Sequence, residues 1–254
     1  WDDCLGEAEQ FIGMSREDAR VSIVDWFKGS GLLEDIREYS HSVGHSYRSH
    51  VPIEPYLSDQ WYVKVTDDRL CNEALRSLSL DQYDGEPPVR NSGARNGDGE
   101  LRFTPARYAK AFQAWHENLR DWCISRQRSW GVPIPIFVNK KTNEPLRDSE
   151  VVENIAKIYE KEGSDCWFYD DPQKFLGKKY KKEDYIKSND IVEVWFDSGS
   201  THSFVLEKRK DLKWPASMYL EGSDQHRGWF HSSLLESCGT RGRAPFDSIL
   251  SHGF

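Results

Sequence analysis

Apolar residues recur at helical spacing in four stretches of the chain. The first follows Ser15, a residue type that caps helix N-termini, and it carries Glu17 and Asp18 in its first turn, where acidic side chains suit the helix dipole. Gly29 and Gly31 then favour the end of this helix. The other three stretches predict helices over residues 105–119, 149–161 and 224–238.

Short runs rich in Val, Ile, Trp and Tyr predict strands between these helices. They cover residues 60–65, 132–138, 191–196, 217–220 and 248–251. From Trp122 onward strands and helices alternate, and this order implies parallel pairing in a doubly wound sheet of an α/β fold. Residues 81–100 are rich in Gly and Pro and offer almost nothing to bury, so we expect a mobile surface loop there.

Composition narrows the class of protein. The 254 residues carry 34 Lys and Arg against 42 Asp and Glu, and an aromatic share of 13% excludes a disordered acidic tail. No apolar run approaches the roughly 20 residues that cross a bilayer, so we expect no membrane span. The five cysteines are scattered without a Cys-x-x-Cys motif, which argues against a disulfide framework and a thiolate zinc site and suits the cytoplasm.

Polar groups gather most densely in residues 221–230, directly after the apolar run 217–220. In open α/β sheets, ligands bind beyond the carboxyl ends of the strands. Gly222 would let a ligand approach the backbone, and Glu221 and Asp224 could accept hydrogen bonds from a ribose or an ammonium group. The alternative is a capped helix start whose aromatic residues lie in the core.

Three further features extend this candidate site. Gln225 and Trp229 are four residues apart, so they share a helix face and could line one pocket. Trp195 opens the cluster Trp-Phe-Asp-Ser-Gly-Ser-Thr-His at a strand end, which would form a second wall or only a turn. His252 and Gly253 close a third strand and would form a third wall. Motifs for a P-loop, for His-Glu-x-x-His and for Gly-x-Ser-x-Gly do not occur, which excludes those mechanisms.

Two other segments are candidates for binding. His41, His45 and His50 lie within ten residues, but structural zinc needs four ligands and usually thiolates, so surface histidines are the better interpretation. Six lysines in residues 174–187 could contact nucleic-acid phosphates. Acidic residues are interleaved with them and the whole chain is acidic, which favours a solvated loop.

Three ordered motifs resemble the isoleucyl-tRNA synthetase family of class I aminoacyl-tRNA synthetases. They are Asp-Trp-Cys-Ile-Ser-Arg-Gln at 121–127, Trp-Phe-Asp-Ser-Gly-Ser-Thr-His at 195–202 and Tyr-Leu-Glu-Gly-Ser-Asp-Gln-His-Arg-Gly-Trp-Phe at 219–230. Segments of the first half, among them Gly-Met-Ser-Arg-Glu-Asp-Ala-Arg at 13–20, are nearer to the valyl-tRNA synthetases. The change falls near residue 125, in a segment that both families share, and we hypothesise a mosaic of two genes.

The resemblance implies an architecture. Residues 121–254 would form a partial doubly wound parallel sheet, the second half of a split Rossmann catalytic domain. Residues 1–70 would be the exit part of an editing-type insertion domain, and residues 71–120 a mobile loop and a helical return. The family's His-x-Gly-His and Lys-Met-Ser-Lys-Ser elements are missing, and the chain ends directly after an apolar stretch. We therefore expect a piece of a longer protein that is inactive alone.

The implied function is ATP-dependent activation of isoleucine to an aminoacyl-adenylate and its transfer to tRNA, with ATP and Mg²⁺ as substrates and tRNA as partner of a monomeric enzyme. The resemblance implies no catalytic side chain in this segment, and it implies no zinc, because Ser46 and Ser49 stand where many valyl enzymes have metal-binding cysteines. The implied side-chain pocket consists of Trp195 and Trp229. The residues implied to bind the adenylate or ATP are Glu221, Gly222, Asp224, Gln225, His252 and Gly253.

Two alternatives stay open. One methylene in an apolar pocket is worth only ~1–3 kcal/mol, a range for which isoleucine against valine is the standard example, so the two tryptophans do not exclude a valine–tRNA ligase. A non-enzymatic tRNA-binding module is the alternative from a different class of protein.

Overall fold

The computed structural model describes residues 6–86 and 99–254, which fall into two units that divide between Leu57 and Ser58. Most of the loop expected over residues 81–100 therefore lies outside the described residues. None of the described helices is long and apolar enough to cross a membrane.

The first unit contains one regular helix. Helix α1 (Arg16–Gly29) follows a short turn of helix, η2 (Gly6–Phe11), and it confirms the prediction from the sequence. Its N-terminus is capped as expected, because the backbone N–H of Asp18 donates a 3.1 Å hydrogen bond to Oγ of Ser15. None of its residues is buried, so this unit has little core of its own.

A three-stranded parallel sheet organises the second unit. Its order is β2 (Arg102–Thr104), β9 (Ser248–His252) and β8 (Tyr219–Gly222), with both pairs of neighbours parallel. The sheet confirms the α/β class and the two strands expected near residues 217–220 and 248–251. Strand β2 was not predicted, because its three residues are too few to show an alternating pattern.

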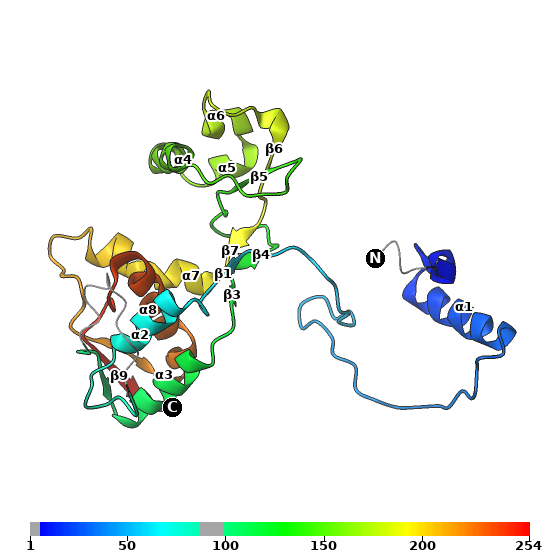
Figure 1. The fold of residues 1–254 in the computed structure, drawn as a ribbon, viewed down its shortest axis with the longest axis horizontal. Helices are drawn as coiled ribbons and strands as arrows, with labels where there is room; N and C mark the ends of the chain where they lie inside the picture. The colour runs from blue at the N-terminus through cyan, green and yellow to red at the C-terminus, as the bar shows by residue number, and fades with distance from the viewer. Residues whose placement is uncertain (1–5, 87–98) are drawn as a thin grey trace. The chain divides into compact units, whose positions relative to one another are not determined.

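Helices α2 (Asp68–Arg76), α3 (Arg107–Glu117) and α8 (Trp229–Arg241) belong to the same core, and Figure 1 shows them gathered around β9. The predicted helix over 224–238 is interrupted at Gly228, and a short helical turn, η5 (Ser223–Arg227), precedes α8. Large side chains buried in this core include Leu75, Leu78, Phe103, Phe112, Leu234, Phe246 and Ile249.

Residues 133–190 form a second body, called the lobe below, which Figure 1 shows as α4, α5 and α6 beside β5 and β6. Its hydrophobic core surrounds Trp167, which is fully buried. The strands of the lobe are antiparallel, so the parallel pairing expected for residues 132–138 is wrong. The elements are β5 (Phe137–Asn139), α4 (Ser149–Glu162), α5 (Cys166–Tyr169), α6 (Pro172–Leu176), η3 (Lys182–Asp184) and β6 (Tyr185–Lys187).

The lysine-rich segment belongs to this lobe. Lys174 contacts carboxylates of Glu162 and Asp170 at 2.5 and 2.6 Å, and Lys182 contacts Asp171 at 2.5 Å. These pairs agree with a solvated, internally neutralised face rather than a surface that is free to bind phosphates.

Two short antiparallel ribbons flank the lobe in sequence. They are β1 (Tyr62–Val63) with β3 (Trp122–Cys123), and β4 (Ser125–Arg126) with β7 (Ile191–Val192). The strand predicted over 191–196 is therefore wrong beyond Val192, since helix α7 (Val194–Gly199) begins there. The reason is local: the carboxylate of Glu193 accepts a 2.9 Å hydrogen bond from the backbone N–H of Trp195 and caps the new helix. A further helical segment, η4 (His202–Leu206), follows it.

Candidate functional site

The carboxyl ends of β8 and β9 lie side by side, as the sequence predicted. Their register pairs Glu221 with Ser251 and Gly222 with His252. Glu221 and His252 are both exposed, and Gly253 continues from the end of β9. Both residues therefore lie at the carboxyl end of the sheet, where ligands bind in this class of fold, although the register directs their side chains to opposite faces.

The turn that follows β8 is tightly built. The side-chain Oε1 of Gln225 accepts a 3.0 Å hydrogen bond from the backbone N–H of Trp229, which closes the turn onto the first residue of α8. The exposed carboxylate of Asp224 accepts a 3.2 Å hydrogen bond from the amide of Gln225. A Cβ at Gly222 would overlap Cζ of Phe254 and would lie 2.8 Å from Oδ1 of Asp224, so only glycine leaves room for these side chains.

Trp195 reaches the same turn from α7, not from a strand end. A Cβ at Gly228 would lie 2.9 Å from Cη2 of Trp195 and 2.7 Å from Oε1 of Gln225, so the indole packs directly on the glycine backbone. The Trp195 side chain keeps 38% of its surface exposed. Trp195 and Gln225 are thus neighbours, although 30 residues of sequence separate them.

Trp229 has a different environment. Its ring stacks on Tyr219 with centroids 4.1 Å apart and planes at 8°, and its Nε1 donates a 3.0 Å hydrogen bond to the carbonyl oxygen of Ser198. Both contacts tie α8 to its neighbours. In this geometry Trp229 anchors α7, while Trp195 presents the exposed apolar surface.

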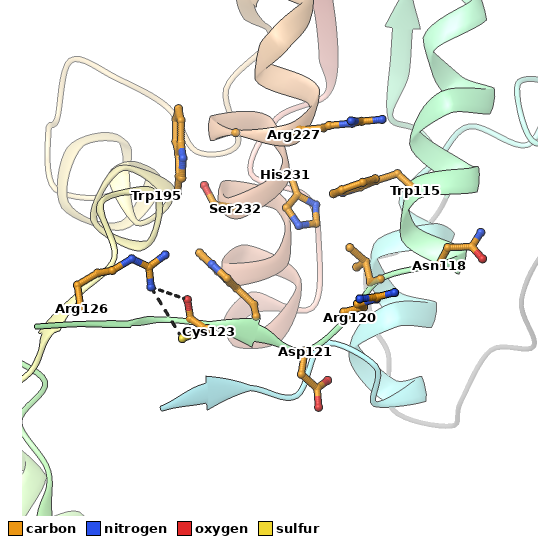
Figure 2. Close-up of a pocket in the computed structure, with 13 residues that line it drawn as sticks. Trp115, Asn118, Arg120, Asp121, Cys123, Arg126, Trp195, Arg227, His231 and Ser232 are labelled. Atoms are coloured by element: carbon orange, nitrogen blue, oxygen red, sulfur yellow. Dashed lines mark hydrogen bonds between the residues drawn. The ribbon is translucent and has the colours of Figure 1, made fainter. Parts of the chain in front are cut away.

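Trp195 also lines a pocket of about 490 Å³, and Figure 2 shows the residues around it. Of the predicted site residues, only Trp195 lines it. Arg227 lies over the ring of Trp115 at 4.7 Å from its centroid. The other lining residues are Asn118, Leu119, Arg120, Asp121, Trp122, Cys123, Arg126, Gly228, His231 and Ser232.

His231, which lines this pocket, forms a hydrogen-bonded pair with the buried His116. Nδ1 of His116 donates to the carbonyl oxygen of Phe112 at 2.8 Å, so its Nε2 accepts, and Nδ1 of His231 lies 3.3 Å away. Burial lowers the pKa of His116 to about 3 and that of His231 to about 4. Both rings are therefore neutral near pH 7, and Nε2 of His231 remains an acceptor.

Three carboxyl groups cluster between α7 and α8. Burial, and then the nearby carboxyl groups of Asp197 and Glu193, raise the pKa of Glu236 to about 9. Burial, and then Glu193, also raise the pKa of Asp197. Sequence reasoning missed this cluster, because Glu236 lies about 40 residues from the other two and no local pattern connects them.

A second hollow, of about 910 Å³, lies between the start of α7 and the lobe. Arg126 and Arg128 line it together with aromatic side chains such as Trp130 and Tyr169. Helix α7 thus borders two hollows, with Trp195 in the first and Asp197 in the second. Among the described residues, no group of three or more His, Cys, Asp or Glu side chains is arranged to hold a metal ion.

Comparison with known proteins identifies the family. The family model described as tRNA synthetases class I (I, L, M and V) matches residues 9–254. The chain belongs to this family. It is 58% identical over 236 residues to the isoleucine–tRNA ligase of Pelagibacter ubique, a match that covers 93% of the chain and 24% of the relative.

More distant relatives agree. The isoleucine–tRNA ligase of Brucella abortus (strain 2308) is 47% identical over 93% of the chain and 23% of its own length. That of Caldicellulosiruptor bescii is 39% identical over 98% of the chain and 25% of its own length. The chain thus spans about a quarter of the length of these class I relatives.

These matches also correct the mosaic hypothesis. A single isoleucine–tRNA ligase is similar to 93% of the chain, which includes most of the half with valyl-like segments. The first half therefore needs no separate valyl ancestor, and the valine alternative is not favoured. Short motifs such as the one at residues 13–20 misled because they are too brief to separate related synthetases.

Proposed function

We propose that this chain is part of an isoleucine–tRNA ligase and supplies one wall of the site that activates isoleucine with ATP and Mg²⁺. The activated amino acid then passes to tRNA. The observation that carries the proposal is the convergence of the β8 and β9 ends with the β8–α8 turn, which gathers polar groups at an open sheet edge.

Each group has a role that its chemistry supports. Glu221 is an exposed acceptor suited to the ammonium or ribose part of the adenylate, and Asp224 and Gln225 lie at the start of the next turn for the ribose. His252 and Gly253 lie beside the adenine. Gly222 leaves room for the side chains of Asp224 and Phe254, which pack on its backbone.

The amino-acid side chain would contact the exposed face of Trp195. Trp229 helps to hold this face in place through its hydrogen bond to Ser198 of the same helix, α7. Positioning of this kind accounts for much of the rate in phosphoryl transfer chemistry. Residues 1–70, which include the unit that ends at Leu57, correspond in this proposal to the exit part of an editing insertion. The four described cysteines are free thiols, which supports a reducing compartment such as the cytoplasm, and we propose a monomer.

Calorimetry with non-hydrolysable isoleucyl- and valyl-adenylate analogues tests the proposal on the chain itself. We expect the isoleucyl analogue to bind more tightly. Glu221→Ala should weaken binding by roughly 1.5–3 kcal/mol, the contribution of a hydrogen bond to a charged group. The matched control is Glu153→Ala, which removes an exposed carboxylate from α4 of the lobe and should leave binding unchanged.

Two results would contradict the proposal. Equal affinity for both analogues would return valine to consideration, and no binding with retained tRNA affinity would favour a tRNA-binding module. We also expect the isolated chain to show no pyrophosphate exchange, since the His-x-Gly-His and Lys-Met-Ser-Lys-Ser elements are absent from it.

A further inference from the structure

Glu236 occupies an unusual place in the contact between α7 and α8. The contact is close because residue 199 is a glycine: a Cβ there would overlap Oε1 of Glu236 and would lie 2.9 Å from Oγ of Ser232. The Glu236 side chain thus reaches the backbone at the last residue of α7. Only a glycine permits this approach.

The carboxyl group is not held by partners of its own. Oε1 of Glu236 is buried and has no hydrogen-bond partner among the described residues. The nearest charged neighbours that act on it are both acidic, Asp197 on α7 and Glu193 at its N-cap. A carboxylate placed against two carboxylates in a poorly solvated contact is unfavourable, whereas a neutral carboxylic acid fits there.

The position of α7 determines the position of Trp195. Helix α7 has only six residues, and it packs along α8. Near the start of α7, Trp195 packs on Gly228. At its end, Nε1 of Trp229 donates a hydrogen bond to the Ser198 carbonyl oxygen, and Glu236 contacts Gly199.

We propose that Glu236, as a neutral carboxylic acid packed on Gly199, is a positioning residue that holds α7 on α8 and so holds Trp195 at the amino-acid side-chain wall. The inference rests on the proposed function only for its consequence for isoleucine. When the carboxyl group ionises, repulsion by Asp197 and Glu193 opens the α7–α8 contact and displaces the indole.

The surroundings of Glu236 set the expected pH range. From α7 the facing groups are Asp197 and Glu193, which favour the neutral acid. Strand β8 contributes Tyr219, whose hydroxyl lies 3.3 Å from Oγ of Ser233. Segment η4 contributes His202, whose Nδ1 lies 3.0 Å from the carbonyl oxygen of Gly199.

The remaining facing elements complete this set. Arg241 of α8 is paired with Glu207, and α2 contributes the ion pair of Glu73 and Arg76. Each of these cations already has an acidic partner, so neither is free to stabilise an ionised Glu236. With a pKa of about 9, Glu236 should be neutral at pH 7.5 and ionised near pH 10.

Hydrogen exchange on the chain itself tests the positioning role without any substrate. At pH 9.5 the amides of residues 194–199 should exchange faster in the wild type than in Glu236→Gln, which keeps the shape and cannot ionise. At pH 7 the two should be equal. Amides of α4 in the lobe are the internal reference. Equal exchange of residues 194–199 at pH 9.5 would overturn the proposal, whatever the activity of the protein.

Kinetics of isoleucine-dependent pyrophosphate exchange in the full-length enzyme tests the consequence. From pH 8 to pH 10, KM for isoleucine should rise by about tenfold more in the wild type than in Glu236→Gln, the factor of one pKa unit, with similar kcat. Comparing the two proteins removes the titration of the substrate's ammonium group. Glu236→Ala should raise KM at both pH values, with rescue by the Gln variant.

A second variant protects the test against misfolding. Asp197→Asn removes one repelling charge and should reduce the alkaline rise in KM without removing Glu236. A lower melting temperature with an unchanged KM profile in both variants would show a merely structural role and refute the inference. Wild-type protein without isoleucine-dependent exchange at pH 8 would instead refute the proposed function.

Discussion

The two hydrophobic cores of residues 58–254 differ in what they bury. Among the described residues, every polar or charged residue that is buried as a whole lies outside residues 133–190, although the side chain of Asp148 in the lobe keeps only 8% of its surface exposed. The core around the parallel sheet contains His116, Ser232 and Ser233 at 1% exposure or less, and Glu193 nearby at 6%. The lobe core is apolar around Trp167 and keeps its charges on the surface as ion pairs.

This difference separates a core that supports a site from one that supports only a fold. Burying polar groups costs free energy unless each finds a partner. The lobe meets that cost at the hydroxyl of Tyr159, which is buried without a hydrogen-bond partner among the described residues. The sheet core meets it at several groups where α7, α8 and α3 surround Trp195 and the adjoining pocket. Ionisable groups inside a core make its free energy of unfolding depend on pH. The stability of the lobe should therefore change little near neutral pH.

The largest effect should come from the apolar core. Trp167→Ala removes a fully buried ring and the 2.7 Å hydrogen bond from its Nε1 to the Ser188 carbonyl oxygen. We expect the lobe to lose ~3–5 kcal/mol of unfolding free energy, because a large cavity remains. Urea denaturation followed by hydrogen exchange measures this. Adenylate-analogue binding should persist, and Trp130→Ala, which removes a side chain that is 91% exposed, is the control.

The second largest effect should come from acid, because lowering the pH should destabilise the sheet core before it destabilises the lobe. His116 and His231 are neutral in the folded protein, with pKa values of about 3 and 4 against about 6.5 when unfolded, so the unfolded state binds more protons as the pH falls. Below pH 6.5 the sheet core should lose up to roughly 1.4 kcal/mol per pH unit for each histidine.

The lobe should respond only at lower pH. Lys179 and Tyr180 hold the pKa of Asp148 at about 2, so the stability from that carboxylate is present above its unfolded pKa and is lost as the pH falls through 2. Amide exchange of α8 and of α4 between pH 7 and pH 3 compares the cores. Simultaneous opening of both helices near pH 5 would contradict the assignment.

A smaller effect is expected from two glycines next to the same helix contact. Gly199→Ala should destabilise the sheet core by ~1–3 kcal/mol, since the new methyl group overlaps Glu236. Gly239→Ala places a methyl group at an exposed position of α8, where the nearest atom is Cδ1 of Leu70 at 3.4 Å, and should stabilise the helix by up to ~1 kcal/mol. Thermal melting of both variants checks the opposite signs. A Gly199→Ala variant that melts like wild type would remove the steric basis of the Glu236 contact.

The smallest effect should be on the surface of the lobe. Lys182→Ala breaks the exposed ion pair with Asp171, and we expect no measurable shift of the urea midpoint at high salt and little at low salt. A large shift would mean that the lobe depends on its surface charges, which would weaken the contrast with the sheet core.

Local signals predicted much of this fold. Ser15 capped α1 as expected, and the helix over residues 149–161 appeared as α4, because capping and apolar spacing act within a few residues. The strands near 217–220 and 248–251 paired in parallel. Long-range contacts decided the rest: residues 132–138 paired with a later segment of the lobe to form an antiparallel ribbon, which no local pattern specifies.

The candidate site shows the same limit. Glu221, Gly222 and His252 could be placed together because strand ends in a parallel sheet converge. Trp195 was expected at the end of a strand, but the cap by Glu193 moved it into α7. The His116–His231 pair and the Glu236 contact with Gly199 join residues 115 and 37 positions apart, and only the fold brings them together.

Strand β8 stands at one end of its sheet, with β9 on its inner side and no described strand on its outer side. Leu220, at the middle of β8, is 54% exposed there. Such a border carries free backbone donors and acceptors that a further parallel strand can satisfy. If the chain is produced alone, the edge of β8 can pair with another copy of the chain. The yield of unaggregated protein should then fall as the concentration rises, and it should improve when a fragment that supplies a neighbouring strand is co-expressed.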